Sequence, residues 1–354
     1  MSDFTYTLDA DGVATITWDC KDKSMNVMSF EGFEDFEALI DKALDDDKVK
    51  GLIITSGKDS FAGGMDLNVL ARLKEEAGDN PAKGVFDGVM RIHGILRKLE
   101  RAGMDPKTNK GGKPVVAAMP GTGMGIGFEI PLACHRIIAA DNPKAKIGLP
   151  EIMVGIFPGA GGTTRLIRKM GAMAASPFLL EGKALAPAKA VQAGLIDEVV
   201  AAGELQARAK EWVLAATDAD IVKPWDAKGY KMPGGAPYTP AGFPTMVGAN
   251  AMVFGKTKGA FPAAKALLAA VYEGALVPFD TALKVEARWF TKVIMDPTSG
   301  AMIRSLFLNK QALEKGAVRP AGIPDQSVKK VGVLGAGMMG AGIALVSALA
   351  GIEV

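Results

Sequence analysis

The sequence is poor in the residues that most often hold metals or act as nucleophile and base. It contains two cysteines, Cys20 and Cys134, and two histidines, His93 and His135. Two cysteines are too few for a disulfide framework, so a reducing compartment is expected. No HExxH motif and no Ser/His/Asp arrangement is present, so we expect no metal site and no triad hydrolase. Both histidines are interpreted as structural or surface residues.

Long apolar runs and an excess of one charge are also missing. Forty-one basic residues against thirty-nine acidic ones leave a net charge of +2, which gives no argument for a nucleic-acid partner. Residues 1–12 have neither the basic start nor the apolar stretch of a secretory signal. No run of about eighteen apolar residues predicts a membrane span. A cytoplasmic location is therefore expected.

Two glutamates stand in a glycine-rich stretch, residues 121–165. Glu129 follows the glycine-dense turn 121–127, and Glu151 precedes the cluster 158–162. Glycines let backbone N–H groups turn toward a ligand, and the start of a helix adds the positive end of its dipole. Addition of water next to a carbonyl needs a base, an acid and a holder for the oxyanion, which this stretch can supply. The alternative is that each glutamate only complements a helix dipole.

The segment 121–165 resembles the core of the crotonase (enoyl-CoA hydratase/isomerase) superfamily. The segment 60–67, with the sequence SFAGGMDL, is similar to the first oxyanion loop of that family. The resemblance covers roughly the first two hundred residues, and its motifs occur in order. It implies an α/β fold, a crotonase-like spiral of ββα units, with Glu129 and Glu151 as catalytic residues. It also implies an oxyanion hole from the backbone N–H groups of Met65 and Ile126. The substrate-binding residues that it implies are Ala62, Gly64, Asp66, Leu67, Asn68 and Gly125.

One of these positions departs from the family pattern. Position 126 is more usually glycine in the family, whereas this sequence has isoleucine. A backbone N–H is available from isoleucine as well. The question that the substitution raises is whether Ile126 can adopt the backbone angles without strain.

The N-terminal residues predict one ββα layer of such a spiral. Alternating apolar residues on both sides of Asp11-Gly12 predict a hairpin of residues 6–9 and 13–18. Apolar spacing predicts a helix over 29–44 with Ser29 as its N-cap, and residues 51–55 predict a buried strand. Further strands are expected at 114–119, 137–140 and 146–149, a helix from near 163, and final helices near 217. The glycines of 158–162 are interpreted as the start of that helix, without a catalytic part.

The remaining residues predict two further regions. The first domain is expected at 1–217, and a helical linker region at 218–325. Within the linker, residues 220–262 predict a connector or a loosely packed insertion. Ala282, Val285, Trp289 and Val293 have helical spacing.

A dinucleotide-binding motif follows, in which Gly335, Gly337 and Gly340 fit G-x-G-x-x-G after the apolar residues 331–334. These residues resemble the first strand and helix of a Rossmann domain of a 3-hydroxyacyl-CoA dehydrogenase, truncated within 326–354. The acidic residue expected about twenty positions later is missing. We therefore expect no competent NAD site in this chain, and NAD only in a full-length parent.

The order of the two segments, hydratase-like and then dehydrogenase-like, resembles that of the multifunctional β-oxidation enzymes of the bacterial α-subunit type. The resemblance implies syn addition of water to trans-2-enoyl-CoA, with coenzyme A as part of the substrate and no cofactor for hydration. The alternatives are a double-bond isomerase of the same fold, a non-catalytic scaffold for a thiolase partner, and a plain NAD-dependent dehydrogenase. A thiolase β-subunit and a homo-oligomer are possible partners. Acyl chain length is not predicted.

Overall fold

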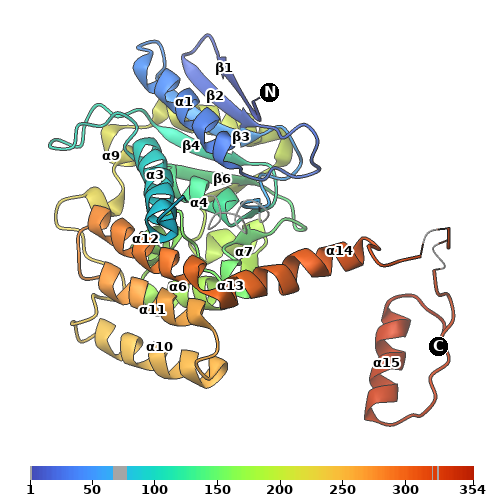
Figure 1. Cartoon of the computed structure of the whole chain (residues 1–354). Coiled ribbons are helices and arrows are strands. Elements are labelled where there is room, and N and C mark those ends of the chain that lie inside the picture. The colour runs from blue at the N-terminus through green and yellow to red at the C-terminus, as the bar shows by residue number, and fades with distance from the viewer. Residues whose placement is uncertain (1, 67–77, 321, 325–326) are drawn as a thin grey trace. The chain divides into compact units, whose positions relative to one another are not determined.

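A computed structural model of the chain describes residues 2–66, 78–320, 322–324 and 327–354 (Figure 1). It divides into two compact units, Met1–Leu308 and Asn309–Val354. No helix in the described part of the chain is both long and apolar enough to cross a membrane.

The first unit is built on a six-stranded sheet in the order β1-β2-β3-β4-β6-β9. β1 and β2 form an antiparallel hairpin, and every later neighbour in this sheet is parallel. A small second sheet has the order β5-β7-β8. The strands are β1 Phe4–Leu8, β2 Val13–Trp18, β3 Gly51–Ser56, β4 Val115–Met119, β5 Gly123–Met124, β6 Arg136–Ala140, β7 Ile147–Gly148, β8 Ala184–Leu185 and β9 Glu198–Val200.

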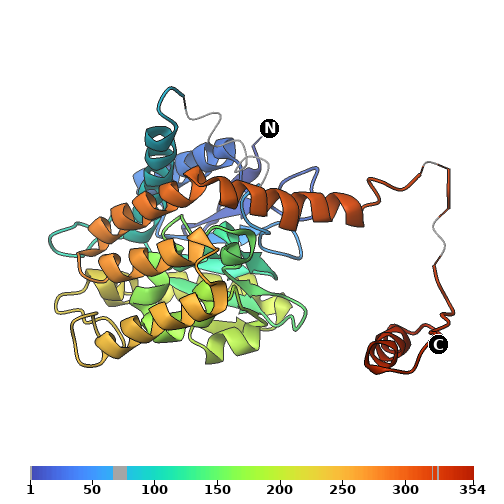
Figure 2. The same ribbon diagram turned by 60° about the horizontal axis from the view of Figure 1, so that its bottom comes forward.

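Helices cover the sheet and extend beyond it (Figures 1 and 2). Those of the first unit are α1 Phe30–Asp45, α3 Pro81–Arg101, α4 Ile126–Ala133, α5 Gly162–Met170, α6 Ala172–Leu180, α7 Pro187–Gln192, α8 Leu205–Ala215, α9 Asp218–Ile221, α10 Gly242–Thr257, α11 Pro262–Gly274, α12 Phe279–Met295 and α13 Pro297–Met302. Short 3-10 helices span Glu151–Val154 (η1), Ala202–Glu204 (η2) and Pro224–Asp226 (η3), and a π-helical stretch (η4) spans Ile303–Asn309.

The local signals of the sequence account for the first layer. Gly12 closes the β1–β2 hairpin with a φ of +87°, a conformation that suits glycine. The Oγ of Ser29 accepts the Gly32 N–H at 3.0 Å and so caps α1, as expected.

Both faces of the sheet are buried, because successive side chains of a strand point to opposite sides. Leu52 and Ile54 of β3 lie in the main core, whereas Ile53 belongs to a second cluster against α8. Such two-sided burial explains why the parallel strands are continuous apolar runs.

The region 220–262 contains regular helical structure. Its residues form η3 and the sixteen-residue helix α10. Trp225 stacks on Phe279 of α12 with ring centroids 5.0 Å apart. Aromatic and charged side chains therefore anchor η3, whereas α10 buries only Gly242 and Met246, so the expectation of a linker or a loosely packed insertion stays a prediction. The predicted boundaries at 217 and 325 stay predictions, and residues 218–308 share one compact unit with the residues before them.

Helix α12 buries a different stripe from the one expected. Ala282 and Val293 are buried, but Val285 and Trp289 are only half-buried. The fully buried stripe includes Glu286, which is 1% exposed. α12 packs against α3 and α11, and in Figures 1 and 2 the helices α10, α11 and α12 lie side by side.

The second unit contains α14 Lys310–Glu314 and α15 Met338–Leu349. Residues 331–334 are not a strand; only Lys330 forms an isolated bridge, with Glu353. A strand needs a hydrogen-bonded neighbour, and no other strand of this unit is available among the described residues.

Candidate active site

The two predicted oxyanion loops lie side by side. Phe61 and Ala62 both donate their N–H groups to Thr122 O, at 2.8 and 3.0 Å. Met124 N donates back to Ala62 O at 3.0 Å, and Ala62 forms a parallel bridge with Gly123. The segments 61–66 and 121–126, about sixty residues apart in sequence, are thus joined by their backbones.

The N–H group of Met65 points away from the segment that pairs with its loop. Met28 N donates to Gly64 O at 2.9 Å and Asp66 N donates to Met28 O at 3.0 Å, so the N–H of Met65 points away from Met28. It donates to no acceptor in the described part of the chain. Gly64 makes this geometry possible with a φ of +117°.

Helix α4 begins at the second loop, and the strained angle falls on Gly125 rather than on Ile126. Gly125 has φ +57° and ψ −128° and donates its N–H to Gly148 O at 3.1 Å. Ile126 is the first helical residue and is not among the described residues with positive φ. Its N–H has no intrahelical acceptor and no other acceptor among the described residues. The substitution of isoleucine therefore imposes no backbone strain.

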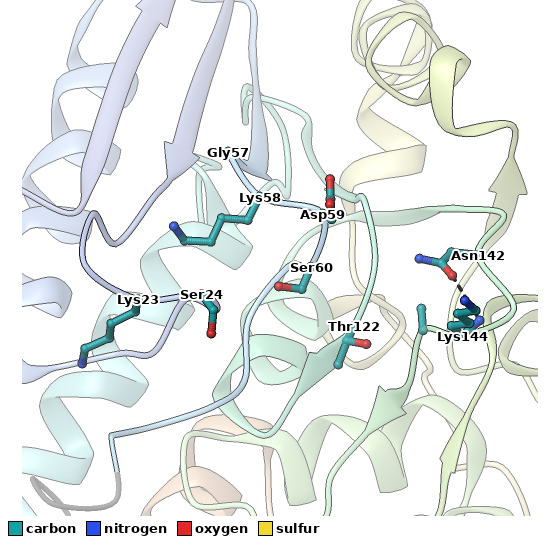
Figure 3. Close-up of a pocket in the computed structure, with 10 residues that line it drawn as sticks. Lys23, Ser24, Gly57, Lys58, Asp59, Ser60, Thr122, Asn142 and Lys144 are labelled. Carbon is teal, nitrogen blue, oxygen red and sulfur yellow. Dashed lines mark hydrogen bonds between the residues drawn. The ribbon is translucent and has the colours of Figure 1, made fainter. Parts of the chain in front are cut away.

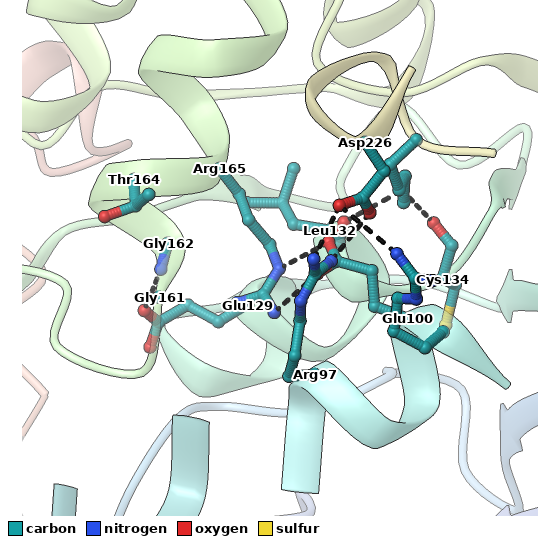
Figure 4. Close-up of polar contacts among 12 residues, drawn as sticks. Arg97, Glu100, Glu129, Leu132, Cys134, Gly161, Gly162, Thr164, Arg165 and Asp226 are labelled. Carbon is teal, nitrogen blue, oxygen red and sulfur yellow. Dashed lines mark hydrogen bonds and ion pairs between the residues drawn. The ribbon is translucent and has the colours of Figure 1, made fainter. Parts of the chain in front are cut away.

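Glu129 lies one turn into α4 and is 3% exposed. Its Oε1 accepts the N–H of Ala160 at 2.9 Å and that of Gly162 at 2.7 Å, at the start of α5 (Figure 4). Burial raises the pKa of Glu129 well above its ordinary value, and the charges of Glu151 and Glu286 raise it further. The two N–H groups act in the opposite direction, because they stabilise the ionised form.

Glu151 opens the 3-10 turn η1, after Pro150. Its Oε2 is shielded from solvent, and no donor among the described residues reaches it. Burial raises the pKa of this carboxyl to about 8; its own backbone N–H acts against this and the charge of Glu286 adds to it. A buried carboxyl with one oxygen that no described donor reaches favours its protonated form.

The surroundings of Gly125 show how closely Glu151 approaches the first oxyanion loop. A Cβ atom at this glycine would lie 3.2 Å from Oε1 of Glu151 and 3.6 Å from Cα of Gly64. Gly125 therefore separates the carboxyl of Glu151 from the loop that ends at Met65. The structure brings Glu129, Glu151 and both predicted oxyanion segments into one neighbourhood.

The turn 158–162 has a role that the sequence does not reveal. The glycines alone predict only the start of a helix, yet the N–H groups of Ala160 and Gly162 hold Glu129. Glu286 of α12 binds the same turn through the N–H of Gly161. A signal for Glu286 is present in the sequence, because a glutamate inside an apolar helical stripe requires partners when it is buried.

A buried ion-pair network supports this turn from the other side. Nε of Arg165 lies 3.0 Å from Oε1 of Glu100, and both side chains are fully buried. Arg97 pairs with Glu100 and with Asp226, at 2.8 and 2.6 Å. In Figure 4, Arg165 turns toward Glu100 while Glu129 reaches toward Gly162. The network ties α3, α5 and η3 together around the site.

His93 and both cysteines are buried, and His135 is half-buried. His135 accepts the Val115 N–H at Nδ1 and contacts Glu100 O through Nε2, at 2.9 Å in both cases. Burial lowers its pKa to about 3, with Lys223 acting in the same direction. Nε2 of His93 lies 2.7 Å from Gly159 O, which makes this histidine part of the surroundings of the site. Both cysteines are free thiols.

Among the other residues implied by the resemblance, Asp66 pairs with Lys23 at 3.0 Å and Ala62 is buried. Leu67 and Asn68 lie outside the described residues. A polar pocket of about 510 Å³ adjoins the first loop (Figure 3). It is lined by Lys23, Ser24, Gly57, Lys58, Asp59, Ser60, Thr122, Asn142, Lys144 and Ala145.

No cluster of His, Cys, Asp or Glu in the described part of the chain is arranged to hold a metal ion. In the second unit, Gly337 precedes α15, and a Cβ at Gly340 would lie 1.7 Å from Gly335 O. That close approach fits the glycine turn of a dinucleotide site, but α15 has no buried residue. We assign no reaction to these glycines.

Comparison with known proteins identifies the family of this chain. The chain matches the family described as enoyl-CoA hydratase/isomerase over residues 9–222. It is 35% identical over 350 residues to the fatty acid oxidation complex subunit alpha of Shewanella halifaxensis, and 34% identical over 364 residues to that of Acinetobacter baylyi. The alignments cover 97% and 98% of this chain but 46% of each relative, so the chain spans about half their length.

Solved structures agree in fold. Human mitochondrial delta3-delta2-enoyl-CoA isomerase matches with a TM-score of 0.59 at 21% identity, over 89% of this chain and 100% of that one. An enoyl-CoA hydratase from Bacillus halodurans matches with a TM-score of 0.58 at 20% identity, over 86% and 100%. The fold is therefore crotonase-like. The chain belongs to the enoyl-CoA hydratase/isomerase (crotonase) family.

Proposed function

We propose that this chain adds water to trans-2-enoyl thioesters of coenzyme A, giving 3-hydroxyacyl thioesters by syn addition. The observation that carries the proposal is the convergence on Gly125: the Glu151 carboxyl and the Gly64–Met65 backbone flank this glycine, and Glu129 lies one helical turn later. Two acids beside two N–H groups that donate to no acceptor among the described residues form the set of groups that such a hydration requires.

The N–H groups of Met65 and Ile126 are proposed to bind the thioester oxygen. They polarise the double bond and stabilise the enolate-like charge that develops as water attacks C3. Loss of one donor of this kind typically raises the barrier by about 3–4 kcal/mol. This role is compatible with any residue other than proline at position 126, because only its backbone takes part.

The hydrogen bonds support a division of labour between the glutamates. Glu129 accepts two N–H groups at the start of α5, which oppose the rise of its pKa and stabilise its carboxylate, so we assign it as the base that takes a proton from water. Glu151 has an oxygen without a donor among the described residues, so we assign it as the acid that protonates C2. The two carboxyls titrate as a pair, and the pH–rate profile reports on both together.

The polar pocket of Figure 3 supports a coenzyme A substrate. Lys23, Lys58 and Lys144 line it, beside the loop that leads to Ala62. Ammonium groups suit the phosphates of coenzyme A, although Lys23 and Lys58 also pair with carboxylates of this chain. In this scheme the thioester extends from the pocket past the two oxyanion loops.

The names of the relatives raise further proposals. The curated relatives are subunits of a fatty acid oxidation complex, which supports a place in β-oxidation and in an assembly. A thiolase β-subunit as partner, and NAD-dependent 3-hydroxyacyl-CoA dehydrogenation in a full-length parent, remain predictions. The dehydrogenation would depend on the half of the relatives that the alignments do not cover.

The test is a hydration assay across acyl lengths, followed by the loss of the conjugated enoyl absorbance. Glu129→Gln and Glu151→Gln should each lower kcat by about 10²–10⁴-fold. The surface variant Glu273→Gln, whose side chain pairs with Arg288, is the matched control and should leave the rate unchanged. A Glu151→Gln enzyme that hydrates crotonyl-CoA at the parent rate contradicts the two-acid scheme.

A second assay distinguishes the proposed hydratase from the isomerase alternative. With a trans-3-enoyl thioester, an isomerase produces the same absorbance instead of removing it. An enzyme that performs only this reaction is not a hydratase, and an enzyme inactive in both arms supports the scaffold alternative.

A further inference from the structure

A third carboxylate, Glu286, is buried beside the catalytic pair. It lies on α12, outside the family match of residues 9–222, and is 1% exposed. A buried carboxylate is costly unless it is fully hydrogen-bonded, so its contacts indicate what it stabilises.

The hydrogen bonds that Glu286 accepts come from the turn 158–162, which also holds Glu129, and from the first residues of α5. Oε1 of Glu286 accepts the Gly161 N–H at 2.6 Å, and Oε2 accepts the N–H and Oγ1–H of Thr164, at 2.8 and 2.6 Å. The N–H groups of the neighbouring Ala160 and Gly162 point to Glu129 instead. Successive N–H groups of one turn are therefore shared alternately between two carboxylates.

The carbonyl groups of the same turn are also held. Nε2 of His93 lies 2.7 Å from Gly159 O and 3.6 Å from Oε1 of Glu286. A carbonyl only accepts, so Nε2 carries the proton of this contact; Nδ1 is buried and has no partner among the described residues. Nη1 of Arg165 donates to Ala160 O at 3.3 Å. The turn has little freedom to move once Glu286 holds it.

We propose that Glu286 is a positioning residue: by binding Gly161 and Thr164 it fixes the N–H groups of Ala160 and Gly162 that orient Glu129. The inference rests on the hydratase function proposed above and assigns part of that site to a helix far along the chain. Glu286 does not touch the reacting atoms. It acts through the turn and through its charge.

The charge has a separate consequence. Glu129 on α4 and Glu151 on η1 both lie close enough for the carboxylate of Glu286 to raise their pKa. The nearby cation on α5, Arg165, is engaged with Glu100 of α3. Removing the negative charge of Glu286 should therefore lower the pKa of both catalytic carboxyls.

Glu286→Gln tests both effects. Its amide keeps one acceptor oxygen but presents N–H groups to the remaining donors. We expect kcat to fall about 10–100-fold with KM within about twofold of the parent, because orientation is lost and binding is not. Both limbs of the kcat profile between roughly pH 5 and roughly pH 10 should move to lower pH. Asp280→Asn is the control on the same helix, because its exposed side chain pairs with Arg97 and does not contact the turn.

A folded Glu286→Gln enzyme with the parent kcat and pH profile overturns the inference. So does a fall in kcat that follows only the folded fraction, with both limbs in place. If this variant does not fold, Thr164→Val removes one hydrogen bond and keeps the charge: a fall in kcat of about 3–10-fold is expected, and an unchanged kcat contradicts the proposal. A parent chain that does not hydrate enoyl thioesters refutes the proposed function instead.

Discussion

Glu151→Gln should stabilise the protein at alkaline pH even though it removes the proposed catalytic acid. The pKa of Glu151 is raised from an ordinary 4.5 to about 8, mainly by burial. The folded state therefore binds the proton more tightly than the unfolded chain. For a raised carboxyl pKa, the stabilising contribution is complete below about pH 4.5 and is lost as the pH rises through about 8. Glutamine stays neutral throughout and loses nothing.

The magnitude follows from the displacement of the pKa. At about 1.4 kcal/mol for each tenfold change in the ionisation equilibrium, the upper limit is about 5 kcal/mol. Glu151 keeps some solvent contact and shares its proton with Glu129, so about 2–3 kcal/mol is a realistic expectation. An unfolding entropy of about 2.1 cal/mol/K per residue gives about 0.65 kcal/mol/K for residues 1–308. The expected difference in Tm is therefore about 3–5 °C.

The assay is a series of thermal melts of the parent and Glu151→Gln between roughly pH 4.5 and roughly pH 9. The two melting temperatures should coincide at the acid end and separate above neutrality, with the variant higher. Glu273→Gln, on the surface of α11, should follow the parent at every pH. A difference that does not vary with pH, or a parent that is the more stable protein at pH 9, would refute the reasoning.

Three more predictions come from single contacts. Gly162→Ala should lower kcat by about 100-fold in the hydration assay, because the new Cβ would lie 2.6 Å from Oε1 of Glu129. A kcat equal to that of the parent would contradict the role of Gly162 in holding Glu129. Gly125→Ala, at φ +57°, should cost about 1–2 kcal/mol in urea unfolding and also reduce kcat, whereas the open glycine Gly94→Ala should do neither. Arg165→Met should cost about 3–5 kcal/mol in the same unfolding assay, since it leaves a buried carboxylate without this partner, and a cost below about 1 kcal/mol would show that Arg97 suffices.

Much of the fold and many of the candidate site residues could be predicted from the sequence alone, because the strongest signals are local. The hairpin at Gly12 and the Ser29 cap depend on neighbours a few residues away, and the β3 strand is visible as a short apolar run. The glycine-rich loops with Glu129 and Glu151 likewise carry a pattern that can be read in order along the chain. The crotonase family and the α/β fold followed from those motifs, and both are confirmed.

The features that the sequence did not predict depend on tertiary context. The 331–334 segment has the composition of a strand, but a strand exists only when a partner strand is available. The concern about strain at Ile126 belonged one residue earlier, because where a helix begins decides which residue takes the positive φ. In the region 220–262, composition does not indicate that Trp225 and Asp226 find partners on α12 and α3, because those partners are distant in the sequence.

The sequence by itself determined which residues could do chemistry, since glycines, glutamates and their spacing are local properties. Tertiary structure decided how those residues are held. Glu286 reaches the turn at 158–162 from more than a hundred residues away, and His93 reaches it from the other direction. Contacts of that kind arise from the packing of α3, α5 and α12, and the local pattern of a single chain segment contains no information about which distant helix will lie against it.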